Sequence, residues 1–197
     1  GGMIMCKARY ADAIDKAVFP GLQGGPHNGT TAAIAVALQE AQSEEFKAYA
    51  QQVVDNARIL GEALSARGFA LSSGGTDNHL ILIDMTDRGI TGYQMAKSLD
   101  AAGIVCNFNS VPFDSRPARK PSGIRIGTPA ITSRGFGSDE MKQLAEWMDR
   151  VATARADETL EKDDRVEINA EVRAEVRALC DRFPAPGLLY DGDGQPL

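Results

Sequence analysis

An arginine between two glycines is the feature of this sequence with the clearest chemical potential. The run SGIRIGTP, residues 122–129, alternates like a β-strand and places Arg125 on one face, with only Gly123 and Gly127 beside it. Glycine weakens a strand, so this pair indicates that a ligand or another backbone comes close. Because a guanidinium fork matches both oxygens of a carboxylate, Arg125 is a candidate carboxylate site. The alternative is an ion pair with an Asp or Glu at the edge of the sheet.

A pair of consecutive glycines is the second candidate. Gly24 and Gly25 lie in the segment AVFPGLQGGPHN, residues 17–28, whose prolines and glycines predict a shaped loop. The backbone N–H groups of consecutive glycines can converge on an anion, and the start of a helix adds its dipole. The pair is therefore a candidate phosphate site, although a simple tight turn is the more common reason for such a pair. His27, next to it, is interpreted as a loop residue rather than a general base.

Amide and imidazole side chains complete the set of candidates. Asn107 and Asn109 belong to the segment NFNS at the end of a predicted strand. Asparagines there usually satisfy turn backbone, but an amide that faces a cleft can also contact the edge of a heterocycle. His79 follows Thr-Asp-Asn and is predicted to be a turn or core residue with no catalytic role.

Composition limits the classes of function. The formal net charge is -6, and no long run of Lys or Arg is present, which argues against a nucleic acid or an anionic membrane as the main partner. Cys6, Cys106 and Cys180 are widely spaced without a CxxC pair, a pattern that fits reduced thiols better than disulfides or a zinc site. No metal site is predicted. No secretory signal is visible, so the cytoplasm is the expected location.

The elements that must position these residues follow from periodicity. We expect Met3–Cys6 to form a strand, and a helix capped by Thr30 or Thr31 to be buried on all sides because it is apolar all round. An amphipathic helix is expected from Ser43 to Gly68. The later elements are predicted as strands at 69–71, 79–84, 104–107 and 123–127, a loop at 110–121, and helices at 91–99, from 138, and at 165–183. This mixture indicates an α/β or α+β layer fold.

The sequence contains five distinctive segments in this order: GGMIMCK, DKAVFPGLQGGPHN, SGGTDNH, NFNSVPFD and SGIRIGTPAITSRGFG. Their occurrence together in this order is typical of serine hydroxymethyltransferases. The match extends over residues 1 to about 155, and the chain resembles the C-terminal half of this family. The resemblance implies an α/β fold-type I pyridoxal-phosphate transferase. It assigns residues 1–29 to the end of the large domain with its phosphate-side loop, 30–67 to interdomain helices, 68–183 to the C-terminal small domain and 184–197 to an irregular tail.

The resemblance also implies roles for the candidate residues. Arg125 matches the arginine that binds the substrate carboxylate, and Gly24 and Gly25 match glycines that approach the cofactor phosphate from the neighbouring subunit of a homodimer or higher oligomer. Asn109 matches an asparagine that contacts folate. The implied reaction of one-carbon metabolism converts serine and tetrahydrofolate to glycine and 5,10-methylenetetrahydrofolate, with pyridoxal 5'-phosphate as the electron sink.

Three departures from the family pattern bear on activity. Phe108 stands where a lysine is usual and Gly29 where a second histidine is common, which leaves room for altered specificity. The family's Schiff-base lysine lies just upstream of the Gly-Gly with which this chain starts, so the segment is expected to be inactive alone. None of its seven lysines matches the cofactor lysine: Lys7, Lys16, Lys47, Lys97, Lys120, Lys142 and Lys162. The alternatives are another fold-type I enzyme, aminotransferase-like or a variant hydroxymethyltransferase, and a non-catalytic dimerisation or truncation fragment.

Overall fold

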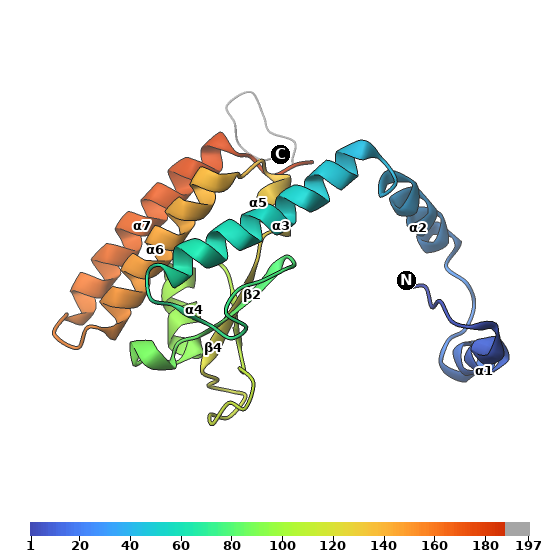
Figure 1. Ribbon diagram of the computed structural model, residues 1–197, viewed down its shortest axis with the longest axis horizontal. Coiled ribbons are helices and arrows are strands. Elements are labelled where there is room, and N and C mark those ends of the chain that lie inside the picture. The colour runs from blue at the N-terminus through green and yellow to red at the C-terminus, as the bar shows by residue number, and fades with distance from the viewer. Residues whose placement is uncertain (188–197) are drawn as a thin grey trace. The chain divides into compact units, whose positions relative to one another are not determined.

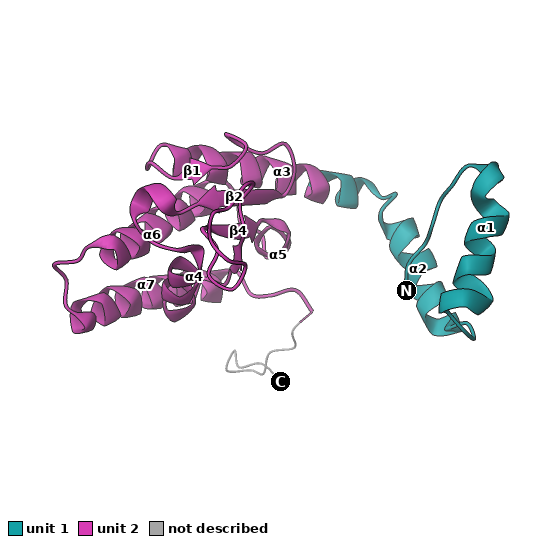
Figure 2. Ribbon diagram, turned by 90° about the horizontal axis from the view of Figure 1, so that it is seen from below, with its two compact units in different colours: residues 1–48 teal, residues 49–197 magenta. Residues whose placement is uncertain are grey.

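The computed structural model describes residues 1–187 and divides into two compact units (Figure 2). Unit 1 comprises Gly1–Ala48, and unit 2 begins at Tyr49. The division falls inside the long helix α3, Glu44–Ser65. The domain boundaries predicted from the family resemblance stay predictions, and most of the tail predicted for 184–197 lies outside the described residues.

Unit 1 is helical. It contains η1 (Ala8–Tyr10), α1 (Ala11–Lys16), η2 (Ala17–Leu22) and α2 (Asn28–Glu40). The strand predicted for Met3–Cys6 is wrong, since these residues have no regular secondary structure. A strand needs a partner for its backbone hydrogen bonds, and in the described part of the chain no strand pairs with this segment.

Helix α2 differs from its prediction in both start and burial. It begins at Asn28, and the hydroxyl of Thr31 donates to the carbonyl of His27 at 3.3 Å instead of capping the helix. None of its residues is buried within this chain, and Val36 and Leu38 are 56% and 46% accessible. The predicted burial is therefore wrong here, because the short helical turns of unit 1 do not cover an apolar surface that extends around the whole helix.

Unit 2 is built on an antiparallel sheet with the order β1-β2-β4-β3. The strands are β1 (Ala70–Leu71), β2 (Leu80–Asp84), β3 (Asn107–Asn109) and β4 (Gly123–Gly127). The strand predicted for 104–107 is displaced. The N–H of Ile104 bonds the carbonyl of Leu99 at 2.8 Å to close the preceding helix, and Ile104 is buried in the core.

Helices cover this sheet (Figure 1). The helices predicted after Ser43, Thr91 and Ser138 and near 165–183 are confirmed; Thr91 caps its helix through a reciprocal bond with Gln94. The short helix α5 was not predicted. Besides α3, the helical elements of unit 2 are η3 (Thr86–Arg88), α4 (Gly92–Ala101), α5 (Pro129–Ser133), α6 (Ser138–Ala156) and α7 (Lys162–Arg182).

The core lies between one face of the sheet and the helices. Ile81 and Ile83 of β2 and Ile124 of β4 are almost fully buried, as the alternation predicts. Burying such a side chain stabilises the fold by roughly 1.5–3 kcal/mol. A slip of one residue in β4 would bring Arg125 into this core, so burial of the isoleucines fixes the face on which the arginine lies.

Helices α6 and α7 form a pair held by apolar contacts and a polar clamp. Trp147 is buried, and its indole N–H donates to the carboxylate of Glu175 at 2.6 Å. Arg150 bonds the same carboxylate at 2.7 Å and Glu171 at 3.2 Å. These bonds lower the pKa of the Glu175 carboxyl, with the Arg150 hydrogen bond as the largest cause.

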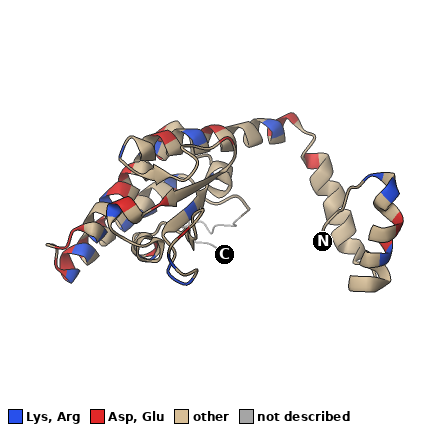
Figure 3. Ribbon diagram, turned by 60° about the horizontal axis from the view of Figure 1, so that its bottom comes forward, with Lys and Arg blue, Asp and Glu red and all other residues tan. Residues whose placement is uncertain are grey.

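Charged residues of both signs are interspersed over the helices (Figure 3). Among the helices of residues 1–187, none combines the length and the apolar character that a membrane crossing requires. Within the same residues, no group of three or more His, Cys, Asp or Glu side chains is placed to hold a metal ion.

Candidate active site

Arg125 lies in the middle of β4, between Leu82 of β2 and Asn107 of β3. Its side chain is exposed on the face opposite the core, as predicted. The guanidinium donates to the side-chain oxygen of Asn107 at 3.3 Å. No ion pair between described residues includes Arg125, so the alternative of a salt bridge at the sheet edge is wrong. Within residues 1–187, no carboxylate compensates the charge of this arginine, which lies on an accessible face.

An open pocket of about 470 Å³ surrounds this arginine. Its polar lining is formed by His79, Asn107 and Arg125. His79 reaches the pocket because it precedes β2, whose first residue, Leu80, pairs with Gly127 of β4. His79 was predicted to be a turn or core residue, because periodicity within one segment carries no information on which strands pair.

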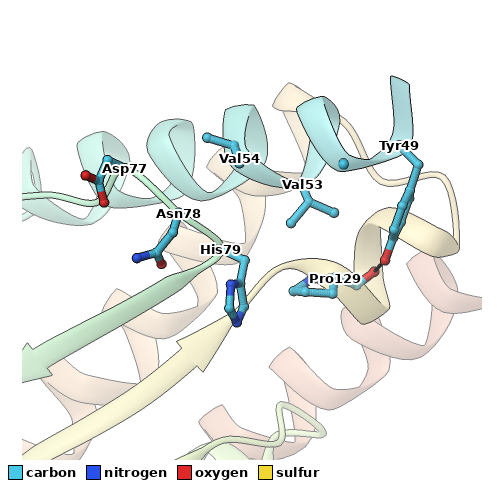
Figure 4. Close-up of a pocket in the computed structure, with 8 residues that line it drawn as sticks. Tyr49, Val53, Val54, Asp77, Asn78, His79 and Pro129 are labelled. Atoms are coloured by element: carbon cyan, nitrogen blue, oxygen red, sulfur yellow. Dashed lines mark hydrogen bonds between the residues drawn. The ribbon is translucent and has the colours of Figure 1, made fainter. Parts of the chain in front are cut away.

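The imidazole of His79 also lines a second pocket of about 350 Å³, shown in Figure 4. Tyr49 stands on the other side of this pocket, and its hydroxyl donates to the carbonyl of Pro129 at 3.1 Å. Val53 contributes an apolar wall. His79 therefore stands between an apolar pocket beside α3 and the polar pocket of Arg125.

The glycines beside Arg125 allow backbone segments to pack closely. A Cβ atom on Gly92, at the start of α4, would collide with the carbonyl oxygen of Gly123. A Cβ on Gly123 itself would lie 2.6 Å from Cγ1 of Val111, and one on Gly127 would lie 3.2 Å from the carbonyl oxygen of His79. Of the two predicted causes, ligand or backbone, the structure shows the backbone. These contacts fix β4 at both ends and thereby locate Arg125.

Strand β3 adds amide groups to the face of Arg125. Asn109 pairs with Gly123, so the alternation of β3 places Asn107 and Asn109 on the same face as the arginine. The amide nitrogen of Asn109 donates to the carbonyl of Ser110 at 3.0 Å. Phe108 points to the opposite face and packs edge-on against Tyr93, with ring centroids 5.4 Å apart.

The predicted loop between β3 and β4 is confirmed and is organised by Asp114. Its carboxylate accepts the backbone N–H and the hydroxyl of Ser122 at 2.9 and 2.8 Å. It also accepts the N–H groups of Arg116 at 2.9 Å and Val111 at 3.3 Å. The pKa of Asp114 is lowered to about 2, chiefly by the N–H of Ser122 and then by that of Arg116.

Gly24 and Gly25 lie in unit 1, just before α2. Both are exposed, and a Cβ atom on either would meet nothing within 4 Å. Their N–H groups donate to no acceptor in the described part of the chain. Space and unpaired donors beside the start of a helix of 13 residues suit a phosphate group. Neither glycine shares a unit with Arg125 or Asn109.

Cysteine chemistry in the described residues is that of free thiols: Cys6, Cys106 and Cys180 form no disulfide. Cys106 lines the pocket of Arg125. Burial, followed by the charge of Asp100, raises the pKa of this thiol to about 11. Cys106 is therefore a protonated thiol at neutral pH, not a nucleophile.

Residues 4–148 match the family described as Serine hydroxymethyltransferase. A protein with this name from Sorangium cellulosum is 61% identical over 188 residues, which are 95% of this chain and 43% of the relative. A relative of the same name from Desulfotalea psychrophila is 60% identical over 190 residues, 96% of this chain and 43% of the relative. Another from Acidothermus cellulolyticus is 57% identical over 188 residues, 95% of this chain and 44% of the relative. The chain thus spans less than half the length of these relatives, and it belongs to the serine hydroxymethyltransferase family.

Proposed function

We propose that this chain supplies the substrate-carboxylate and folate contacts of a serine hydroxymethyltransferase, which transfers the hydroxymethyl group of serine to tetrahydrofolate. The observation that carries the proposal is the guanidinium of Arg125, which has no carboxylate partner among the described residues and faces an open pocket with Asn107. Three relatives that are 57–61% identical to the chain over 188–190 residues carry the name of this enzyme.

Arg125 would hold the substrate by two parallel N–H···O bonds to its carboxylate. A carboxylate held in this way fixes the orientation of the substituents on the substrate Cα, which reduces the entropic cost of activation for breaking one chosen bond. Asn109, on the same face of the sheet, would bind the edge of the folate ring through its amide. The chain therefore contributes binding and orientation.

Pyridoxal 5'-phosphate, when bound, would supply the electron sink for this reaction. Gly24 and Gly25 would receive its phosphate, because their unpaired N–H groups and the open space beside them suit an anion at the start of α2. We propose that they do so in the active site of the neighbouring subunit of a homodimer or higher oligomer. The exposed apolar surface of α2 supports burial on association.

The test is the formation of 5,10-methylenetetrahydrofolate from serine by a full-length enzyme that carries these residues. A practical form is a chimera, hereafter the full-length enzyme, in which residues 1–197 replace the matching part of the Sorangium cellulosum relative. We expect product formation that depends on both serine and tetrahydrofolate. Transamination of serine without folate would contradict the proposal and favour an aminotransferase.

A second test concerns the isolated chain. We propose that none of its seven lysines forms the covalent link to the cofactor, and that the chain alone is inactive. The chain is mixed with pyridoxal phosphate, treated with borohydride and analysed by peptide mass spectrometry. A stoichiometric adduct at one lysine would contradict this part of the proposal. We propose the cytoplasm as the location, in keeping with the free thiols.

A further inference from the structure

We propose that Asp114 is a positioning residue, which holds the end of β3 against the start of β4 and thereby sets the place of Asn109 relative to Arg125. The inference rests on the proposed function of these two residues. Asp114 would act through the backbone and would touch neither substrate.

The carboxylate of Asp114 bridges the two sides of the loop. One oxygen accepts the N–H of Val111 at 3.3 Å and that of Ser122 at 2.9 Å. The other accepts the hydroxyl of Ser122 at 2.8 Å and the N–H of Arg116 at 2.9 Å. Val111 lies two residues after Asn109, whereas Ser122 lies directly before the first residue of β4. One side chain thus joins the segments that follow and precede the two candidate binding residues.

The two sides of this bridge differ in their other supports. On the β4 side, the carbonyl of Ser122 accepts the N–H of Met85 at 3.0 Å, and that of Pro121 accepts the N–H of Gly92 at 2.9 Å. Strand β4 also pairs with strands on both sides. Strand β3 consists of three residues at the edge of the sheet, so its end depends more strongly on Asp114.

The charge state of Asp114 fits this role. Ionised carboxylates accept stronger hydrogen bonds than neutral groups, and the low pKa of Asp114 keeps it ionised at neutral pH. No ion pair within residues 1–187 involves Asp114. The carboxylate therefore serves the loop backbone and does not anchor the basic side chains of the loop.

The experiment compares Asp114→Asn with the unchanged full-length enzyme. Asparagine keeps the size of the side chain but removes its charge. Its amino group opposes either the N–H groups of Val111 and Ser122 or the N–H of Arg116, according to the orientation of the amide. We expect the KM for tetrahydrofolate to rise roughly tenfold, because the charge-assisted bond that holds Val111 is weakened or lost. The KM for serine should stay within about twofold, since β4 keeps its other supports.

Asp157→Asn is the matched control. Asp157 accepts the N–H of Thr159 at 2.8 Å and its hydroxyl at 2.7 Å, in a similar local turn between α6 and α7. We expect both KM values to be unchanged in this variant. If Asp114→Asn does not fold, Ser122→Ala removes a single donor to Asp114, and a smaller rise confined to the KM for tetrahydrofolate is expected.

An unchanged KM for tetrahydrofolate, or an equal rise in both KM values, would overturn the positioning role. Hydrogen exchange separates this failure from failure of the proposed function. In Asp114→Asn, exchange should accelerate more at residues 107–111 than at 122–127, whatever reaction the enzyme catalyses. Equal acceleration in the two segments would overturn the inference. If the full-length enzyme without any substitution does not cleave serine in a folate-dependent reaction, only the proposed function is overturned.

Discussion

The side-chain oxygen of Asn107 accepts a hydrogen bond of 3.3 Å from the guanidinium of Arg125, directly across the β3–β4 pair. A neutral amide orients the guanidinium and leaves its positive charge uncompensated. A carboxylate in the same place would form an ion pair and compete with an incoming acid group. The choice of partner therefore keeps the arginine available for a ligand.

Replacing Arg125 should abolish serine turnover. In the full-length enzyme, we expect Arg125→Ala to lower kcat/KM for serine at least about 100-fold, because two charge-assisted hydrogen bonds are worth roughly 1.5–3 kcal/mol each. Arg125→Lys should recover only part of this loss, since an ammonium cannot make the paired contact. The absorbance of bound cofactor, recorded in parallel, should not change. Kinetics like those of the unchanged enzyme would remove the proposed role.

Placing a carboxylate beside Arg125 tests whether its free positive charge is needed to bind the substrate. Asn107→Asp should form an ion pair with Arg125 and raise the KM for serine roughly tenfold by competing with the substrate carboxylate. Asn107→Ser introduces a neutral hydroxyl in place of the amide and should raise the KM for serine much less. Steady-state kinetics of the two variants decide the matter. An equal rise in both would indicate lost geometry rather than charge competition.

The thiol of Cys106 should resist alkylation. Its pKa of about 11 leaves roughly one molecule in a thousand as thiolate at pH 8, and the thiolate is the reactive form. We expect iodoacetamide to modify the exposed Cys6 of the native chain first, with modification of Cys106 rising steeply toward pH 11. Peptide mass spectrometry gives the rate at each site. Equal alkylation rates of Cys6 and Cys106 at pH 8 in the native protein would contradict the prediction. As a control, the two rates should become equal when the protein is unfolded in urea.

Acid should release the loop held by Asp114. The pKa of this carboxyl is depressed from its ordinary 3.8 to about 2, so its stabilisation is fully present above pH 4 and is lost as the pH falls toward and through 2. Hydrogen exchange at residues 110–122 should therefore accelerate, relative to the rest of unit 2, over this interval. Asp114→Asn should remove this pH dependence. Its persistence in the variant would assign the effect to another acid group.

A buried amide network should be important for the stability of unit 2. Asn56 of α3 is fully buried and donates to the hydroxyl of Thr132 at 2.9 Å and the carbonyl of Phe136 at 2.8 Å. We expect Asn56→Ala to lower the free energy of unfolding by about 2–3 kcal/mol, because both partners lose a bond inside the protein. Arg58→Ala, at an exposed pair with Asp55, should change it by less than about 0.5 kcal/mol. Urea denaturation measures both.

The sequence predicted the elements whose determinants are local. The Thr91–Gln94 cap and the alternation around Arg125 define α4 and β4 because each acts within one turn or one strand. The site was predicted only in part, because Asn107 and His79 reach Arg125 through pairing between distant strands. Strand pairing joins segments that are far apart in the chain, and the periodicity of one segment does not predict its partner.

The errors have similar physical causes. Ile104 was assigned to a strand by its apolar character, but the bond that ends α4 turns it into the core. The strand predicted at Met3–Cys6 lacks a partner in the described residues, and α5, which begins at Pro129, is too short for a periodic pattern. The glycines around Arg125 correctly indicated a close approach, and the structure shows that backbone segments approach there.

The bond between Trp147 and Glu175 gives this molecule an internal optical probe. Trp147 is the only tryptophan in the sequence, and this residue is 2% accessible at the contact between α6 and α7. Its fluorescence emission maximum should lie at a shorter wavelength while the two helices are paired and shift to a longer wavelength when water reaches the indole. Folding of the unit that bears Arg125 can thus be followed in any unlabelled variant that retains this residue.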